Sequence, residues 1–272
     1  MQIPDLSGVR LIASDLDGTL LLNGAQTLRP ETCGLIEQLM ARGVVFVAAS
    51  GRQLANLRRL FAPIADKIGF LCENGGSAYY QNQKIHQELM DEGLAAEIID
   101  AGLQMPDLEI AVSGQRYSYI CPHTPDFYGY MKDTIDFDVA VIPDLKHPPE
   151  PILKVSMHAA AGDWHEDYWQ SRFGSRCKVV SSGNNWIDLM PACVNKAYGL
   201  GKLADALGIP MASVMALGDN DNDREMLEAV GFPVSMDSAK REIRALAAFT
   251  TDTVENLFAH MLERKPDENH TS

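Results

Sequence analysis

Short apolar segments alternate with helix-forming segments near the start of the chain, and this alternation constrains the fold more than any other feature. The apolar segments 9–14, 44–49 and 68–72 have the length of strands that are buried on both faces of a parallel sheet. Segment 30–42 carries helix formers with apolar residues three or four positions apart, and 53–61 also reads as a helix. Repetition of strand, turn and helix predicts an α/β fold with a doubly wound parallel sheet.

The middle of the chain does not repeat this pattern. Its segments mix polar and apolar residues, and a proline-rich loop lies at 143–151. We therefore predict a core made of residues 1–83 and 189–272, interrupted by a small α/β cap domain at 84–188 that selects the substrate. In the insert we expect helices at about 89–102 and 162–173, and strands at 108–112, 117–121, 153–158 and 178–181. After it we expect helices at 197–207, 223–229 and 239–247, and strands at 214–217 and 233–236.

Charge and composition exclude several functional classes. The 272 residues include 23 Lys and Arg against 37 Asp and Glu, a formal net charge of −14. Nucleic-acid and anionic membrane surfaces are bound largely through Lys and Arg, so neither is an expected partner. No apolar run is long enough to cross a membrane, and the first residues lack the pattern of a signal peptide.

The five cysteines are scattered, with no C-x-x-C pair. This odd, dispersed set predicts neither a disulfide framework nor a structural zinc site, and it favours a reducing cytoplasm. The seven histidines show no metal-ligand spacing either.

The segment Asp15-Leu-Asp-Gly-Thr-Leu is the sharpest chemical signal. Asp15 and Asp17 follow a predicted parallel strand, at the sheet edge where open α/β folds bind ligands. Two carboxylates this close require a cation, and oxygen ligands favour Mg²⁺. A calcium loop is the alternative, but the apolar residues after Gly18 do not continue the calcium-binding pattern.

A second acidic cluster, Gly218-Asp-Asn-Asp-Asn-Asp, follows another apolar strand. Alone it is equally well read as a solvated turn that caps the next helix, because Asp and Asn are good N-caps. On the same sheet edge as Asp15, the carboxylates of Asp219 and Asp223 become candidate metal ligands.

Two further signals are weak alone. Ser50-Gly51 ends the second predicted strand, where a hydroxyl and backbone N–H groups suit a phosphate oxygen, although Ser-Gly is also an ordinary turn. Lys196 begins a predicted helix, but most lysines are simply solvated. Arg52 follows Ser-Gly and is a further candidate for contact with the substrate.

Taken together, these motifs resemble the haloacid dehalogenase-like (HAD) superfamily, and more narrowly its Cof-type phosphatases of subfamily IIB, which carry an inserted α/β cap on a Rossmann-like core. The resemblance covers nearly the whole chain, and the order of the motifs makes it specific. They are Asp15 to Leu20, Ser50-Gly-Arg, Asn74-Gly75, Asp188-Leu-Met-Pro followed by Lys196, and Gly218-Asp-x-x-Asn-Asp.

The resemblance implies a role for each carboxylate. Asp15 would be the nucleophile that forms an aspartyl-phosphate, and Asp17 the general acid and then base. Mg²⁺ would be held by Asp15, the backbone carbonyl of Asp17 and Asp219, with Asp223 as an outer ligand or a support.

It also implies the groups that hold the phosphoryl oxygens. These are the Leu16 and Gly51 N–H groups, the Ser50 hydroxyl and Lys196, while Asn222 would bind phosphate or orient the lysine.

Three segments depart from the family pattern: Cys193-Val-Asn before Lys196, Asp237-Ser-Ala, and Asp252-Thr-Val. None of them touches the expected nucleophile, acid or metal ligands, so they bear on substrate fit rather than on the reaction.

We therefore expect a cytoplasmic, Mg²⁺-dependent phosphatase that acts on small phosphomonoesters such as sugar phosphates. A phosphomutase on the same scaffold is one alternative and would require a bisphosphate activator. A non-catalytic metabolite-binding regulator is another, but it predicts a broken motif. The sequence leaves the substrate and the oligomeric state open.

Overall fold

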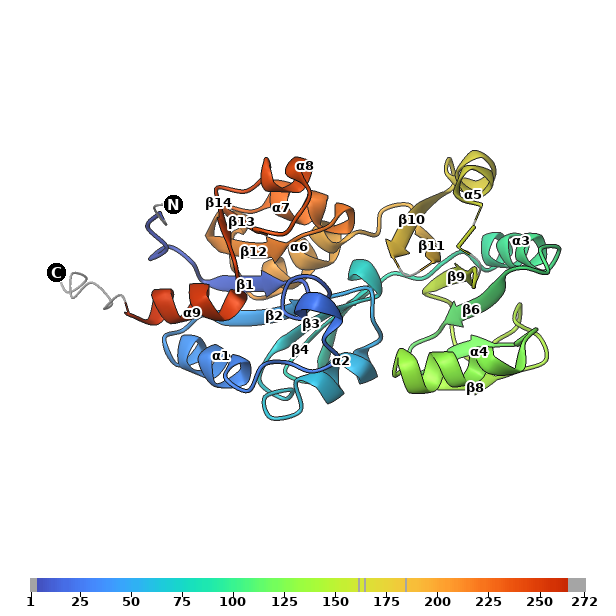
Figure 1. Cartoon of the computed structure of the whole chain (residues 1–272), viewed down its shortest axis with the longest axis horizontal. Coiled ribbons are helices and arrows are strands. Elements are labelled where there is room, and N and C mark those ends of the chain that lie inside the picture. Colours follow the sequence, from blue (N-terminus) through green and yellow to red (C-terminus); the bar gives the residue numbers. More distant parts are fainter. Residues whose placement is uncertain (1–3, 161, 164, 184, 264–272) are drawn as a thin grey trace.

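The chain folds into two units, each built on its own β-sheet, which lie side by side along the longest axis of the molecule (Figure 1). The computed structural model describes residues 4–160, 162–163, 165–183 and 185–263. The other residues, which belong to the ends of the predicted core and to the predicted insert, lie outside the described part of the chain.

The larger sheet has eight strands in the order β14-β13-β12-β1-β2-β3-β4-β5. Its pairs are parallel from β14 to β3, and β4 and β5 add an antiparallel hairpin at one edge. The strands are β1 (Leu11–Ser14), β2 (Val45–Ala49), β3 (Gly69–Cys72), β4 (Ser77–Tyr80), β5 (Gln83–Gln87), β12 (Val214–Gly218), β13 (Phe232–Met236) and β14 (Phe249–Thr251).

Helices cover both faces of this sheet, so neighbouring residues of one strand are buried in different cores. Ile12 packs with side chains of α1, α2 and α9, whereas Leu11 and Ala13 pack with side chains of α6, α7 and α8. This two-sided burial explains why the strands read as continuous apolar runs. The helices are α1 (Thr32–Ala41), α2 (Leu54–Leu60), α6 (Lys196–Ala206), α7 (Arg224–Ala229), α8 (Arg241–Arg244) and α9 (Val254–Glu263).

The smaller sheet has six strands in the order β10-β11-β9-β6-β7-β8 and is antiparallel except for the pair β7–β8. Helices α3 (Glu92–Gly102) and α5 (Glu166–Phe173) pack in a core with one face of it. On the other face lie α4 (Pro125–Gly129) and the π-helical turn η3 (Tyr130–Thr134). The strands are β6 (Glu109–Ser113), β7 (Ser118–Ile120), β8 (Val139–Val141), β9 (Lys154–His158), β10 (Cys177–Gly183) and β11 (Trp186–Pro191).

The predicted α/β class with a parallel core and an inserted α/β unit is confirmed. Five strands (β4, β5, β8, β11 and β14) and the helices α4 and α9 were not predicted. Strand β5 pairs in the larger sheet and β11 in the smaller one, so both expected boundaries, 83/84 and 188/189, fall inside strands.

The chain leaves the larger unit and returns to it at neighbouring points. After β5 the backbone N–H of Glu88 donates to the Gly76 carbonyl at 2.7 Å. On the return, Tyr198 in the first turn of α6 donates its hydroxyl to Glu88 Oε2 at 2.8 Å. Glu88, in the outgoing segment, therefore contacts the returning segment directly.

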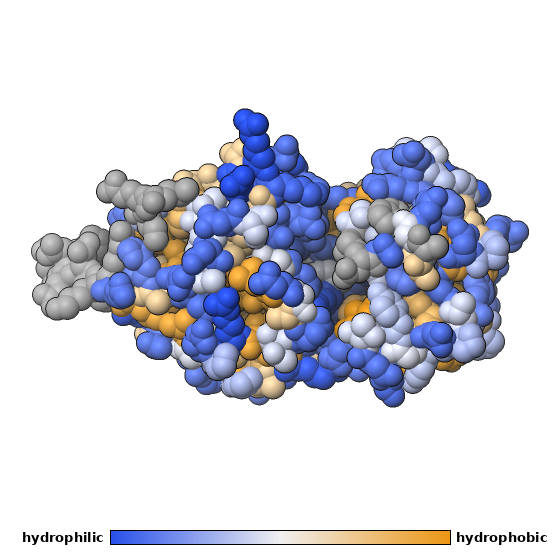
Figure 2. Space-filling model, in the orientation of Figure 1, coloured by the Kyte–Doolittle hydropathy of each residue, from blue (hydrophilic) through white to orange (hydrophobic). Residues whose placement is uncertain are grey.

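The visible surface is mostly hydrophilic, with small apolar areas scattered over both units (Figure 2). Among the described residues, none of the helices has the length and apolar character needed to cross a bilayer.

Candidate active site

The functional motifs meet at the carboxyl edge of the larger sheet. Asp15 follows β1, Ser50 follows β2, and Asn74 follows β3, while Asp219 follows β12. Parallel neighbours end at the same edge, so residues far apart in the sequence come together there.

Lys196 is the buried cation of this edge. Its side chain has no exposed surface, and its Nζ lies 2.5 Å from Asp15 Oδ1 and 2.6 Å from Asp223 Oδ1. Burial opposes a charge on the ammonium, but Asp15 and Asp223 outweigh it and raise the pKa of Lys196. The lysine is therefore held in its charged form between two carboxylates.

Three carboxylates crowd around that ammonium. One oxygen from each of Asp15, Asp219 and Asp223 falls in a group whose members all lie within 4.8 Å of one another. Burial raises the pKa of Asp15 well above its usual value, and the charges of Asp223 and Asp219 raise it further against the opposing Lys196. Burial and Asp223 likewise raise the pKa of Asp219. An all-oxygen group with more negative than positive charge fits a hard divalent cation.

Local hydrogen bonds fix the two carboxylates that follow β12. Asp223 Oδ2 accepts the backbone N–H groups of Asp219 at 3.0 Å and of Asn220 at 3.1 Å. The hydroxyl of Thr19 donates to Asp219 Oδ1 at 3.0 Å. The acidic loop is thus more than a solvated turn, because Asp223 is fully buried.

Gly18 allows the loop after β1 to pass close to Asp219. Its φ is +93°, and a Cβ at this position would overlap the Asp219 carboxylate. The glycine in the Asp15-Leu-Asp-Gly motif is therefore needed both for backbone conformation and for space.

Asp17 points away from the carboxylate group and pairs with Arg52. The guanidinium contacts both carboxylate oxygens, Nε to Oδ2 at 3.0 Å and Nη2 to Oδ1 at 2.6 Å. The Asp17 side chain is 58% exposed, whereas Arg52 is only 15% exposed. The Asp17 carboxylate is not part of the group formed by Asp15, Asp219 and Asp223.

The predicted phosphate-binding residues surround the same edge. Ser50 is buried and its Oγ accepts the Arg52 N–H at 3.2 Å. The Leu16 carbonyl accepts the N–H groups of Thr19 and Leu21, which closes the turn after β1. Asn222 donates to Asn74 Oδ1 at 3.3 Å.

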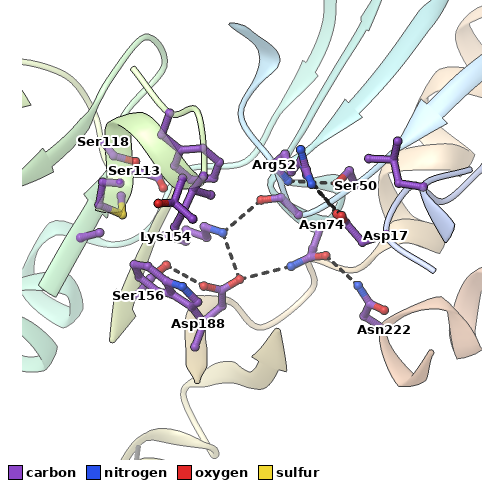
Figure 3. A pocket seen from close by; sticks show the side chains of 18 of the residues that line it. Asp17, Ser50, Arg52, Asn74, Ser113, Ser118, Lys154, Ser156, Asp188 and Asn222 are labelled. Carbon is purple, nitrogen blue, oxygen red and sulfur yellow. Dashed lines mark hydrogen bonds and ion pairs between the residues drawn. The ribbon is translucent and has the colours of Figure 1, made fainter. Parts of the chain in front are cut away.

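A cavity of about 410 Å³ lies between the two units and is lined by Ser50, Gly51 and Asn222, but not by Leu16 or Lys196. Its size falls within the usual range for small-molecule sites. The close-up shows the core residues on one side and Lys154, Ser156 and Asp188 of the smaller sheet on the other (Figure 3). The smaller sheet and its neighbouring turn also contribute Ala111, Ser113, Ser118, Tyr130, Met131, Thr134, Ile135, Phe137 and Trp186.

Lys154 links the two units across this cavity, a role that was not predicted. Its Nζ lies 3.0 Å from Asp188 Oδ2 (Figure 3). It also lies 2.9 Å from Glu73 Oε2 and 3.2 Å from the Gly51 carbonyl. Asp188 also accepts from Ser156 at 2.6 Å. Burial opposes the charge on Lys154, but Asp188 and Glu73 raise its pKa, whereas burial raises the pKa of Glu73. The ammonium is shared by both units.

Nothing local in the sequence marks Lys154 as special. Its partner Asp188 is 34 residues away, on a strand that was not predicted. Its strand segment, Leu153-Lys-Val-Ser-Met-His, mixes polar and apolar residues, so a buried lysine does not stand out there.

Comparison with protein families gives one match over almost the whole chain. The family described as haloacid dehalogenase-like hydrolase matches residues 12–257. This range contains every residue of the carboxylate group and every predicted phosphate-binding residue.

Two curated relatives match over most of their length. The chain is 29% identical over 255 residues to the 5-amino-6-(5-phospho-D-ribitylamino)uracil phosphatase of Escherichia coli, covering 89% of this chain and 90% of the relative. It is 29% identical over 250 residues to the HMP-PP phosphatase of Cronobacter sakazakii, covering 87% of each.

Solved structures show the same fold at lower identity. A haloacid dehalogenase-like hydrolase from Bacteroides thetaiotaomicron superposes with a TM-score of 0.81 at 20% identity, over 93% of this chain and 99% of that one. A structure described as a HAD subclass IIB sugar phosphatase has a TM-score of 0.77 at 18% identity, over 93% and 99%. The predicted core with an inserted unit is therefore a known architecture.

Proposed function

The chain belongs to the haloacid dehalogenase-like hydrolase family, and from this premise we propose that it is a Mg²⁺-dependent phosphatase of small metabolites, in particular sugar phosphates. The prediction of a phosphoric monoester hydrolase is confirmed by curated relatives that are named phosphatases. The metal, the reaction intermediate and the substrate are parts of our proposal.

One observation carries the proposal: Asp15 is a buried carboxylate that lines the cavity and is held on Oδ1 by Lys196. A carboxylate in this position has one oxygen oriented by a cation and the other available to attack. Lys196 alone does not balance the three carboxylates, so a bound cation would be needed before this carboxylate could meet a phosphate dianion.

The group of Asp15, Asp219 and Asp223 would hold Mg²⁺, together with the Asp17 carbonyl. When bound, the ion would offset the charge of the carboxylates and of the incoming phosphate. Asp219 would be a direct ligand, and Asp223 would orient Asp219 and Lys196 through the bonds already described.

In the first step, a carboxylate oxygen of Asp15 forms a bond to phosphorus while the ester P–O bond breaks. The departing alkoxide oxygen takes a proton from Asp17. In the second step, Asp17 removes a proton from water, whose oxygen attacks the aspartyl-phosphate. Inorganic phosphate leaves and the Asp15 carboxylate is regenerated.

Several groups would hold the phosphoryl oxygens in both steps. These are the Ser50 hydroxyl, the N–H groups of Leu16 and Gly51, and Lys196, with Asn222 at the side of the cavity. Loss of one such donor typically lowers the rate about 10²–10³-fold.

The unit built on the smaller sheet would act as the cap that selects the leaving group, because it forms the side of the cavity opposite Asp15 and Asp17. The named relatives act on small phosphorylated compounds, which a cavity of about 410 Å³ would accommodate. We place the enzyme in the cytoplasm, since its five cysteines are unpaired thiols.

The test is release of inorganic phosphate from a panel of phosphorylated metabolites, with Mg²⁺, with EDTA, and with Asp15→Asn. We expect release that needs the metal and is lost in the variant. Phosphate transfer that depends on a bisphosphate activator, with little net release, would indicate a phosphomutase. Binding of metabolites without turnover by the folded protein would contradict both.

A further inference from the structure

The face of the smaller sheet that borders the cavity has two chemically different ends. Residues two apart on a strand share a face of the sheet, so Trp186 and Asp188 lie on the same face of β11. On the neighbouring strand β9, the register partner of Trp186 is His158 and that of Asp188 is Ser156. One end of this face is therefore aromatic and the other end is polar.

The polar end is already occupied by bonds within the protein. The Lys154 ammonium has three N–H donors, and it contacts three acceptors, on Glu73, on Asp188 and on the Gly51 backbone. The Ser156 hydroxyl donates to Asp188 at 2.6 Å (Figure 3). A leaving group could take these donors only by breaking contacts that hold buried charges. We therefore do not expect the polar end to recognise it.

The aromatic end borders the cavity with three rings. They belong to Tyr130, Phe137 and Trp186, and we call them the aromatic wall. The ring of His158 packs against two of them: its centroid lies 4.8 Å from that of Tyr130 and 4.8 Å from that of Trp186, with interplanar angles of 31° and 43°. Ring faces, rather than charged groups, therefore dominate this end of the cavity.

The aromatic wall is held in place by rings that do not line the cavity. The buried Phe127 lies next to His158 and Trp186, with centroid distances of 5.7 and 6.0 Å. Burial lowers the pKa of His158, which favours the neutral ring and its packing as an aromatic group. Rings that are already fixed by packing lose little conformational entropy when a ligand stacks on them.

Small side chains leave space on the sheet next to the aromatic wall. Ala111 is the register partner of Ser156 and lines the cavity, as do Ser113 and Ser118. None of these side chains is large enough to cover the sheet. A flat group can therefore lie along this face beside the rings.

We propose that the leaving alcohol of the substrate carries a flat, unsaturated ring, such as a heterocyclic base, and that the aromatic wall binds this ring. Stacking on aromatic side chains needs no hydrogen-bond partner. The hydroxyls of a bare sugar do need partners when they are buried, and the donors of the polar end are in use. The inference rests on the proposed phosphatase activity and narrows its substrates to phosphomonoesters in which a sugar or alkyl spacer carries such a ring.

The test compares substrates that differ only in the ring. Uridine 5′-phosphate and methyl β-D-ribofuranoside 5-phosphate break the same type of ester bond, but the second has a methoxy group in place of uracil. We expect kcat/KM to be at least about 10-fold higher for uridine 5′-phosphate. The pair 4-phenylbutyl phosphate and butyl phosphate repeats the comparison with a spacer that contains no sugar. Absence of a preference for the ring in both pairs would overturn the inference.

Variants of the aromatic wall locate the preference. Trp186→Ala should lower the ratio of the two kcat/KM values about 10-fold, whereas Trp186→Phe should keep most of it because a ring remains. The matched control is Tyr117→Ala, which removes an exposed aromatic side chain of the same unit that does not line the cavity. A ratio is independent of the amount of folded enzyme. An unchanged ratio in Trp186→Ala would therefore contradict the inference even if that variant is less stable.

Binding without turnover separates this inference from the proposed function. Asp15→Asn lacks the proposed nucleophile, and calorimetry on it should show about 10-fold tighter binding of uridine 5′-phosphate than of the methyl riboside phosphate. Adding Trp186→Ala should remove that difference. Tighter binding of the ring without phosphate release by the wild type would reject the phosphatase and keep the ring site. Phosphate release at equal efficiency from both members of each pair would keep the phosphatase and reject the ring site.

Discussion

Lys196 Nζ and Asp15 Oδ1 lie 2.5 Å apart in a site where the lysine has no contact with solvent. The lysine thus balances part of the charge of the carboxylates and orients the proposed nucleophile at the same time. Its removal would leave buried carboxylates without their cation.

We expect Lys196→Met to lower kcat/KM at least about 10²-fold, because the donor to the phosphoryl group and to Asp15 is lost. The variant should also be less stable than the wild type in EDTA and should gain more thermal stability from added Mg²⁺. Thermal unfolding with and without the metal measures this. An equal gain in both proteins would argue against a shared charge-balancing role.

Asp219→Asn should abolish the stabilisation by Mg²⁺, because a ligand that binds only the folded state raises its stability. The control is Asp221→Asn in the same loop, since Asp221 is exposed and pairs with Lys240 at 2.7 Å. A Mg²⁺ titration of both variants, followed by thermal shift or calorimetry, measures this stabilisation. Retention of the Mg²⁺ response in Asp219→Asn would place the metal elsewhere.

Gly18→Ala should reduce Mg²⁺ affinity and activity together, since the added methyl would displace the Asp219 carboxylate. Gly43→Ala is the control for backbone strain, because Gly43 has a φ of +86° and open space around it. It should cost about 1 kcal/mol of stability without changing the metal response. Similar metal affinities in the two variants would contradict the steric explanation.

Lys154→Met should destabilise the protein by about 3–5 kcal/mol, because Glu73 and Asp188 are left buried without a cation. Combining it with Glu73→Gln and Asp188→Asn removes those charges and should restore much of the stability. Chemical denaturation of the single and triple variants measures the difference. Equal stabilities of the single and triple variants would show that Glu73 and Asp188 find other partners when Lys154 is absent.

Glu150 should contribute stability that depends on pH. Burial opposes its ionisation, but the backbone N–H and the guanidinium of Arg116 hold the pKa of Glu150 below its usual value. The folded-state pKa lies below that of the unfolded chain, which is about 4.3, so this stabilisation is present above that pH and is lost below it. The stability gap between wild type and Glu150→Gln should therefore narrow from pH 7 to pH 3.5. A constant gap would exclude the carboxylate charge as its source.

The sequence was sufficient for five of the six parallel strands, all but β14, and for the convergence of Asp15 with Asp219 and Asp223. Buried parallel strands read as apolar runs, and their ends share an edge. The hairpin β4–β5 was missed, since β5 is a polar edge strand whose pattern resembles a loop. The assignments of individual roles to the site residues stay predictions.

The cross-unit contacts could not be predicted for a different reason. Lys154 meets Asp188 and Glu73, and Asn56 meets Asp136, only after two sheets have packed against each other. The place of each pair depends on the strand register of the smaller sheet, which has no short-range signal in the sequence. Arg52 was a candidate for contact with the substrate, and its observed partner is Asp17.

The two crossings between the units meet at Glu88, which leaves β5, bonds back to Gly76 before β4 and contacts the returning helix at Tyr198. The segment between these points, which forms the smaller unit, begins and ends at neighbouring places and can be called a cassette. The larger unit completes its own sheet without it. Recombination between relatives at these two points could therefore exchange the whole cassette in one event. Such an exchange would replace the smaller unit, with Lys154, and leave Asp15, Asp219 and Asp223 in the larger one.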